Sequence, residues 1–496
     1  MRARQLSATA LALAATFSAT AASAGCDQIL SRIGDALVGV LCFESTDLTT
    51  KNSLTTPGNN TLPGLPAGAF TPETDRGVIS PNPPNRTPIT KAVPGVQLEA
   101  AFAADPTGEA RFVIRLPDDW NGKLVVAGAS GTRSEYNGDF AWSDYVVQKG
   151  YAYASQNKGV LNLRIASLAS PTPPDPLACR LNPASQVWVD FYDNDPAKPF
   201  TQWTQYMIEA GQLAQNAVKA QYNRYPAHTY AVGTSNGGYQ VRRAIEEAPN
   251  IFDGGVDWEG TFIDPSGPNI LIDLPPAIKN WPDYVASGFN PNSQAAKNIV
   301  AAGYPPDIVI GSASLWANYW ASFWEVTQCQ WQKRFDPTWV TYTDGPNNIA
   351  GTGGYNYAAR VAQDPSIALQ VAAVATTGKI KRPLITVAGT MDALLPIKRG
   401  ARAYEDVVNA SRKGNNDRRE AQYRLYEVQN GNHIETYKET FPQLEYIQPH
   451  AQKAFDLLVR HVEDKAELPP SQCIPHGGTI SDAPSQAGRC ASLFVP

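Results

Sequence analysis

The stretch TYAVGTSNGGYQVRRAIEE, residues 229–247, contains the strongest structural signal in the chain. Its beginning is typical of a buried strand and its end of a helix. Between them lie the five residues GTSNG, in which Gly233 and Gly237 flank Ser235. A strand that turns sharply into a helix needs small residues at these two positions, because side chains there would collide with the neighbouring backbone. The pattern predicts a tight turn that presents the Ser235 hydroxyl at the carboxyl edge of a sheet.

Strand-like and helix-like stretches alternate on both sides of this turn. The expected strands are residues 96–103, 110–116, 123–127, 151–155, 229–232, 254–258, 384–388 and 423–428, and the expected helices are residues 142–149, 202–222, 239–247, 399–410 and 449–462. The first two strands are typical of an antiparallel pair. The later alternation indicates an α/β protein with a mostly parallel sheet and helices on both faces. In such sheets the functional groups gather at the carboxyl ends of the strands.

An activated serine needs a base within hydrogen-bond reach and an acid that orients the base. His433 directly follows the last expected strand, in the sequence NGNH, and Asp392 follows the strand at residues 384–388, in the sequence GTMDALLP. Both strands end at the sheet edge where Ser235 is expected. The order serine, acid, histidine is the one found in the α/β-hydrolase fold. The sequence therefore predicts that fold, with Ser235, Asp392 and His433 as a catalytic triad.

Other residues compete for the roles of base and acid. His228 lies at the opposite end of the strand that leads to Ser235, and the remaining three histidines lie in the terminal helix and the tail, at His450, His461 and His476. A structural histidine at the end of a strand is the alternative interpretation of His433. Asp257 and Glu259 are alternative acids. Asp392 is favoured because Leu394, Leu395 and Pro396 follow it and would shield its carboxylate.

A serine hydrolase also needs two donors for the negative charge that develops on the substrate oxygen. We expect one to be the backbone amide of Asn236, at the start of the helix after Ser235. The second is expected in the glycine-rich stretch after residues 123–127, from Ser130 or Gly131. No cofactor or metal is expected, because Asp336 and Asp344 are too sparse to form a calcium site.

Residues 261–381 interrupt the alternation of strands and helices and are expected to form a lid inserted into the hydrolase core, residues 95–260 and 382–465. This stretch carries six of the 11 tryptophans of the chain. Trp316, Trp320 and Trp324 recur every four residues, so a helix would place them on one face. One interpretation is that they pack the lid; the other is that some of them line an apolar substrate cleft.

The two ends of the chain have distinct compositions. Residues 1–24 have the features of a secretory signal peptide, with basic residues, an apolar stretch and the small-residue site Ala-Ser-Ala. A membrane anchor and a lipid-modified Cys26 are weaker interpretations. Residues 25–94, rich in Pro and Asn, are expected to be extended, and residues 466–496 form a C-terminal tail. The protein is therefore predicted to be secreted or periplasmic.

The six cysteines favour three disulfides in an exported chain. Proximity in the sequence suggests the pairs Cys26–Cys42 and Cys473–Cys490, which leaves Cys179 with Cys329, although six cysteines allow about 15 pairings. The formal net charge of −5 and the lack of a basic cluster argue against nucleic acid as a partner. No stretch after residue 24 is long and apolar enough to suggest a membrane partner.

Three motifs together resemble a known group of proteins. GTSNG, GTMDALLP and NGNH make residues 98–462 similar to secreted bacterial α/β-hydrolases of the tannase and feruloyl esterase families and to 3-hydroxybutyrate-oligomer hydrolases. Tannase-type enzymes carry a disulfide between the residue before the serine and the residue after the histidine, whereas this chain has Thr234 and Ile434 there. This departure favours a resemblance to the 3-hydroxybutyrate-oligomer hydrolases over one to the tannases.

The expected function is that of a secreted serine esterase, which forms an acyl-enzyme on Ser235 and acts on a small-molecule or oligomeric ester, either a hydroxyalkanoate oligomer or an aromatic, phenolic ester. A secreted serine peptidase is the first alternative, because the same triad cleaves amides. A non-catalytic surface-binding protein is the second. The complete set of serine, acid and histidine argues against the latter.

Overall fold

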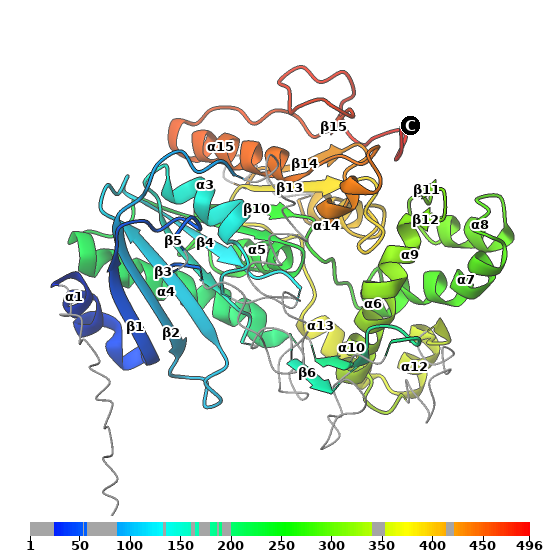
Figure 1. Ribbon diagram of the computed structural model, residues 1–496, viewed down its shortest axis with the longest axis horizontal. Helices are drawn as coiled ribbons and strands as arrows, with labels where there is room; N and C mark the ends of the chain where they lie inside the picture. The colour runs from blue at the N-terminus through cyan, green and yellow to red at the C-terminus, as the bar shows by residue number, and fades with distance from the viewer. Residues whose placement is uncertain are drawn as a thin grey trace, which may run out of the picture.

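The computed structural model describes residues 24–52, 54–56, 87–131, 135–159, 164–167, 179–185, 188–190, 200–339, 353–412 and 421–496 (Figure 1). Residues 1–23 of the expected signal peptide lie outside the described residues. No helix among the described residues is long and apolar enough to cross a membrane.

A ten-stranded sheet forms the centre of the molecule, in the order β1-β2-β3-β5-β4-β9-β10-β13-β14-β15. Its strands are β1 (Leu37–Ser45), β2 (Gly95–Phe102), β3 (Arg111–Pro117), β4 (Lys123–Gly128), β5 (Ala152–Gln156), β9 (His228–Thr234), β10 (Gly254–Trp258), β13 (Leu384–Gly389), β14 (Tyr423–Val428) and β15 (Gln472–Ile474). β2 and β3 are antiparallel, as predicted, and all pairs from β5 to β15 are parallel. The central strands β9, β10 and β13 are almost entirely buried, which agrees with their continuous apolar sequences.

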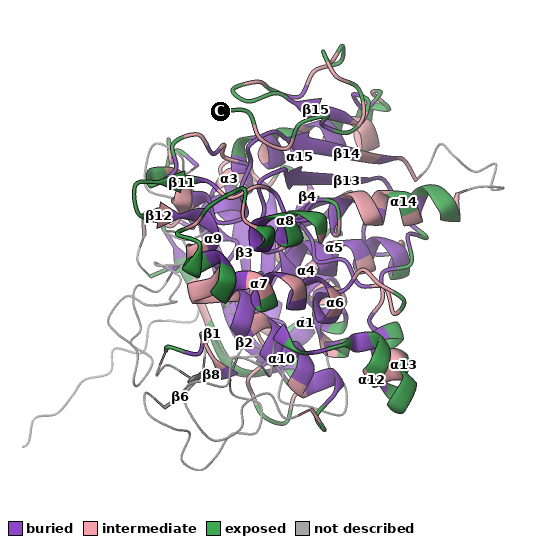
Figure 2. Ribbon diagram, turned by 90° about the vertical axis from the view of Figure 1, so that its right-hand side faces the viewer, coloured by how far each residue is buried: buried purple, intermediate pink, exposed green. Residues whose placement is uncertain are grey.

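Helices cover both faces of this sheet. One face packs against α1 (Ala24–Ile33), α4 (Thr201–Tyr222), α5 (Asn236–Glu247) and α14 (Ala401–Ser411), and the other against η2 (Asp139–Ser143), α3 (Asp144–Val147) and α15 (Gln448–Asp464). In Figure 2 the strands are buried, while exposed residues lie along the outer helices such as α14. This arrangement is the α/β-hydrolase fold that the sequence predicted.

A helical region lies to the right of the sheet in Figure 1. It contains α6 (Ile270–Asp273), α7 (Pro275–Ala286), α8 (Gln294–Ala301), the hairpin of β11 (Val309–Ile310) and β12 (Ala313–Ser314), α9 (Leu315–Tyr319), η3 (Trp320–Trp324), α10 (Glu325–Phe335), α12 (Tyr357–Gln363) and α13 (Ser366–Ala373). These elements all lie within residues 261–381, the stretch expected to form a lid.

A second part of the chain is joined to this helical region by a disulfide. The disulfide Cys179–Cys329 links β7 (Cys179–Arg180) to α10. β7 belongs to a small sheet with β6 (Arg164–Ser167) and β8 (Trp188–Asp190). Within the described residues, β7 therefore packs against α10 of the helical region.

The two ends of the described chain add strands to the central sheet. Residues 25–94 were expected to be extended, but α1 and β1 form there, held together by the disulfide Cys26–Cys42. β1 pairs with β2 and extends the sheet at one edge. At the other edge β15, part of the expected tail, pairs with β14, and Cys473 in β15 is joined to Cys490. All three disulfides match the pairs that the sequence suggested.

Candidate active site

Ser235 occupies a strained turn between β9 and α5. Its backbone angles are φ 59° and ψ −121°, a left-handed conformation that non-glycine residues rarely adopt. The turn is tight because a Cβ atom on Gly233 would lie 2.4 Å from the Gly237 carbonyl oxygen, and a Cβ atom on Gly237 would lie 2.4 Å from that of Gly128. Strain of this kind is typical of a nucleophile held at a sheet edge.

His433 and Asp392 form a buried hydrogen-bonded pair at the same edge. The His433 Nδ1 atom lies 2.9 Å from the Asp392 Oδ2 atom, and both residues are at most 5% exposed. The other carboxylate oxygen of Asp392 accepts the backbone amides of Leu394 and Leu395, at 2.7 and 2.8 Å. These two amides fix the carboxylate, so that its free oxygen points at the imidazole.

The loops that carry these two residues are joined along their backbones. The Met391 amide donates to the Gly431 carbonyl at 2.8 Å, and the Thr390 amide donates to the Val428 carbonyl at 3.0 Å. Gly389 and Gly431 are in direct contact, since a Cβ atom on Gly389 would lie 2.3 Å from the Gly431 oxygen. The acid and base loops therefore form one rigid unit at the carboxyl ends of β13 and β14.

Ser235 is connected to this unit through β10. Its amide donates to the carbonyl of Trp258 at 2.9 Å, and the next residue, Glu259, has its Oε2 atom 3.5 Å from His433 Nδ1. Among the described residues the Ser235 hydroxyl has no hydrogen-bond partner, so its bond to His433 is not formed here. Catalytic hydrogen bonds commonly tighten only when substrate is bound.

The carboxylates around His433 change its titration. Burial opposes a positive charge on the imidazole, but Asp392, its hydrogen bond and Glu259 outweigh burial and raise the pKa of His433 from 6.5 to about 9. An imidazolium at this position is thus strongly stabilised. That is the charged form a general base reaches after taking a proton.

The stretch after β4 lies directly against the Ser235 turn. Asn236 is the first residue of α5, and a Cβ atom on Gly128 would lie 2.8 Å from Gly237 Cα. The Ser130 amide, however, donates to the Asn137 side-chain oxygen at 2.8 Å. This bond favours Gly131 over Ser130 as the second oxyanion donor, because the Ser130 amide hydrogen already has an acceptor. Asn236 and Gly131 stay candidates for the two donors.

Lys158 is a residue of this site that the sequence reasoning missed. It follows β5, is 1% exposed, and its ammonium donates to the carbonyl of Ser130 at 2.9 Å and to that of Gly131. The Ser130 carbonyl and the Gly131 amide belong to one peptide plane and point in opposite directions. Lys158 thereby fixes the direction of the Gly131 amide. Its position just after a strand, at the functional edge of the sheet, was the available signal.

Two of the competing residues, Asp257 and His228, have other partners. Asp257 binds the Arg242 guanidinium at 2.6 Å, and it also accepts from the Thr386 hydroxyl and the Gly260 amide. His228 faces Asp253 at the start of β9, the end away from Ser235. Asp257 is therefore structural, whereas Glu259 lies within the site.

The three tryptophans predicted to contact substrate differ in burial. Trp316 and Trp324 are 1% and 0% exposed and belong to the core of the helical region, where Trp324 packs on Trp281 with ring centres 6.0 Å apart. The enclosed rings of these two tryptophans favour the interpretation that they pack the lid over the one in which they line a cleft. Trp320 is half-buried and stacks on Trp281 at 5.5 Å. It alone of the three has a surface that a ligand can reach.

Glu259, Asp392 and His433 are also a group of metal-binding residue types, with one atom of each within 4.8 Å of the others. A cation here would have to replace the proton between His433 and Asp392, whose 2.9 Å separation is that of a charge-assisted hydrogen bond. We therefore interpret these three side chains as a hydrogen-bonded group that shares protons, and not as ligands of a metal ion.

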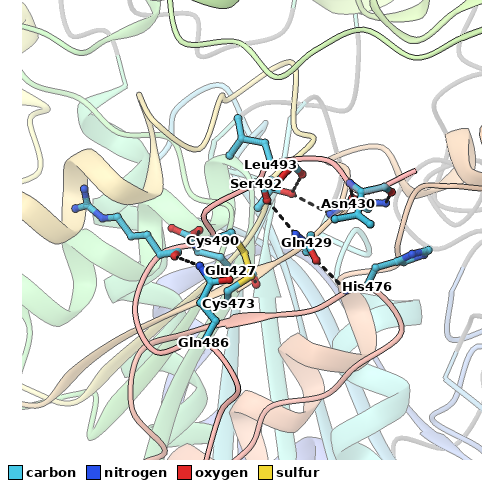
Figure 3. The surroundings of a disulfide bond; sticks show 12 residues. Glu427, Gln429, Asn430, Cys473, His476, Gln486, Cys490, Ser492 and Leu493 are labelled. Atoms are coloured by element: carbon cyan, nitrogen blue, oxygen red, sulfur yellow. Dashed lines mark hydrogen bonds between the residues drawn. A yellow bond between two sulfur atoms is a disulfide. The ribbon is translucent and has the colours of Figure 1, made fainter.

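The C-terminal tail supports the base loop from outside. Figure 3 shows Ser492 and Leu493 beside Gln429 and Asn430, next to the Cys473–Cys490 disulfide. The Gln429 side chain donates to the Ser492 carbonyl at 3.0 Å. The tail thus contacts the two residues that begin the turn leading to His433.

Comparison with known proteins finds similarity at two levels, in part of the sequence and in the fold. The family model described as 3HB-oligomer hydrolase matches residues 347–492, which contain Asp392 and His433. A D-(-)-3-hydroxybutyrate oligomer hydrolase from Burkholderia cenocepacia (strain HI2424) is 34% identical over 113 residues, which cover 21% of this chain and 15% of that relative. The chain therefore spans only a small part of the length of such relatives.

Solved structures extend the comparison to the whole fold. An esterase from Aspergillus oryzae aligns over 89% of this chain and 90% of its own, with 14% identity and a TM-score of 0.53. Feruloyl esterase B from the same organism aligns over 87% and 88%, with 12% identity and a TM-score of 0.48. The protein has an α/β-hydrolase fold, and the resemblance expected from its three motifs is confirmed.

Proposed function

We propose that this protein is a secreted serine ester hydrolase, with Ser235 as nucleophile, His433 as general base and Asp392 as the acid that orients it. The observation that supports this most is the buried 2.9 Å contact between His433 and Asp392 at the sheet edge that carries the strained Ser235. A histidine that merely ends a strand has no need of a buried carboxylate fixed by two backbone amides.

In the proposed reaction the Ser235 Oγ attacks the ester carbonyl carbon while His433 Nε2 takes the hydroxyl proton. The amides of Asn236 and Gly131 stabilise the oxyanion, and Asp392 stabilises the imidazolium. When the carbon–oxygen bond of the ester breaks, His433 returns the proton to the leaving alcohol. Water, deprotonated by the same histidine, then attacks the acyl carbon. The bond to Ser235 Oγ breaks, His433 returns the proton to this oxygen, and the carboxylic acid leaves.

The proposed substrates are oligomeric hydroxyalkanoate esters, with aromatic or phenolic esters as the second class. The match to 3HB-oligomer hydrolases across the acid and base loops supports the first class. The half-buried Trp320 supports a substrate with apolar surface. The three disulfides support export, because such bonds persist in oxidising compartments.

A panel of esters, tested with the purified protein, examines this proposal. We expect turnover of hydroxybutyrate oligomers or aryl esters, and a loss of about 10⁴-fold or more in Ser235→Ala, as for other serine triads. Ser31→Ala, on the exposed side of α1, is the matched control and keeps full activity. Full turnover by Ser235→Ala would remove the role of that residue. Faster cleavage of a peptide anilide than of a p-nitrophenyl ester would identify a peptidase instead.

A further inference from the structure

The strongest unassigned feature of the site is the carboxyl group of Glu259. It follows β10 with a backbone φ of 51°, a left-handed conformation, and its side chain is 2% exposed. Its Oε1 atom accepts the Gly389 amide at 2.7 Å. Its Oε2 atom is buried and has no hydrogen-bond partner in the part of the chain that the structure describes. A buried carboxyl oxygen without a hydrogen-bond partner is costly, so a role is needed that explains its retention.

One oxygen of this carboxyl is fixed by the loop that carries Asp392. The Gly389 amide that holds Oε1 lies three residues before Asp392, and a Cβ atom on Gly389 would lie 2.8 Å from Oε1. This contact directs the free Oε2 toward His433 Nδ1, which lies 3.5 Å away, compared with 2.9 Å for Asp392. The imidazole N–H therefore has two carboxyl groups in front of it, from two neighbouring strands.

We propose that Glu259 is a second acid for His433, which carries a proton while Asp392 is ionised and becomes the orienting carboxylate when Asp392 is absent. This inference rests on the proposed function, because it assigns a positioning role to a residue beside the proposed base. Nothing in the comparisons assigns a role to this residue.

Electrostatics supports a proton on Glu259 in the resting site. Burial raises the pKa of Glu259 well above its ordinary value, and the neighbouring charge of Asp392 raises it further, although His433 opposes this. Two buried carboxylates that face one imidazole cannot both be ionised without strong repulsion. A neutral Glu259 also removes one of the charges that raise the pKa of His433.

The position of Glu259 supports its capacity to replace Asp392. β10 lies between β9, which carries the serine, and β13, which carries Asp392. An acid at the end of either β10 or β13 can reach a histidine at the end of β14. A shift of 0.6 Å would give Glu259 the same distance to Nδ1 that Asp392 has now.

A double-mutant cycle tests the proposal, with kcat/KM measured for a good ester substrate in wild type, Asp392→Ala, Glu259→Gln and the double variant. We expect Glu259→Gln to cost at most a few-fold in the wild-type background and at least tenfold more in the Asp392→Ala background. A purely structural role would give the same cost in both backgrounds and would overturn the proposal. Asp392→Asn, which keeps an oxygen for the Leu394 and Leu395 amides, replaces Asp392→Ala if the latter does not fold.

A titration of the His433 ring by NMR tests the resting proton separately. If Glu259 is neutral, Glu259→Gln leaves the midpoint within about 0.3 pH units, whereas an ionised Glu259 would give a fall of about one unit or more. A stoichiometric divalent metal in the purified protein, with activity lost on chelation, would also overturn the proposal. Ser235→Ala is also measured, in the wild-type and in the Asp392→Ala background. Activity that survives this change refutes the proposed function as a whole, and not only the role of Glu259.

Discussion

Asn430 and Val495 are joined by a reciprocal pair of hydrogen bonds. The Asn430 side-chain amide donates to the Val495 carbonyl at 2.6 Å, and the Val495 amide donates to the Asn430 side-chain oxygen at 2.8 Å. The Asn430 backbone amide in turn donates to the Thr390 hydroxyl, which binds the Leu493 carbonyl. The last residues of the chain therefore hold both the acid loop and the base loop.

Ending the chain at Ala491 is expected to lower kcat by about tenfold and to lower the melting temperature by only a few degrees. The deletion removes several hydrogen bonds of about 1 kcal/mol each while leaving the Cys473–Cys490 disulfide intact. Steady-state kinetics and thermal unfolding measure the two effects. Val495→Ala keeps every backbone bond and serves as the control. Wild-type kcat in the shortened chain would show that the tail does not position His433.

Lys158→Met is expected to reduce kcat by about 10² with little change in KM. The substitution keeps most of the side-chain length but removes the ammonium that binds the Ser130 and Gly131 carbonyls, so the Gly131 amide loses its fixed direction. Lys149→Met is the matched control, because Lys149 forms a surface ion pair with Asp456. An equal fall in kcat for both variants would contradict the role of Lys158.

Gly237→Ala is expected to abolish activity and to yield little folded protein. The added methyl group would lie 2.4 Å from the Gly128 carbonyl oxygen, a backbone atom that no side-chain motion can move away. Circular dichroism and the yield of soluble protein report the effect. Gly34→Ala, where a Cβ atom meets nothing within 4 Å, is the control. A folded and active Gly237→Ala variant would show that the turn can relax.

His450 is expected to make the protein less stable in acid. Burial lowers its pKa from 6.5 to about 4 in the folded state, so the unfolded chain binds a proton there more readily. Its stabilising contribution is fully present above pH 6.5 and is lost as the pH falls toward 4. Urea unfolding of wild type and His450→Gln at several pH values should show a smaller decline in the variant over this window. Identical slopes would contradict the lowered pKa.

Trp324→Ala is expected to destabilise the protein by about 3–5 kcal/mol, as for other large residues removed from a core. Trp324 is completely buried, and its indole N–H donates to the Ala393 carbonyl, next to Asp392, at 2.6 Å. Trp320→Ala is expected to cost less stability but to raise KM for bulky esters more than for small ones. Urea unfolding and a series of acyl chain lengths separate the two effects. Equal KM changes for all esters would remove Trp320 from the substrate surface.

The sequence alone was sufficient for features that depend on local chain geometry. Gly233, Ser235 and Gly237 predict the turn, because only small residues allow the strand and helix to meet there. The order in which Asp392 and His433 follow the serine predicts the fold, because the carboxyl ends of parallel strands meet at one edge. Proximity in the sequence suggested the pairs Cys26–Cys42 and Cys473–Cys490, and Cys179 and Cys329 were paired because they were the two cysteines left.

Only the tertiary structure decided contacts between distant segments. The side-chain distances of Glu259 and Asp392 to His433 depend on how β10 and β13 are placed in the sheet. The burial of Trp324 depends on packing with Trp281, and that of Trp316 on packing with Tyr284, which a helical spacing cannot reveal. The support given by the tail arises from hydrogen bonds across about 65 residues of chain, as in the Asn430–Val495 pair. Such contacts leave no periodic pattern in the sequence, because the partners are set by the folded sheet and not by neighbouring residues.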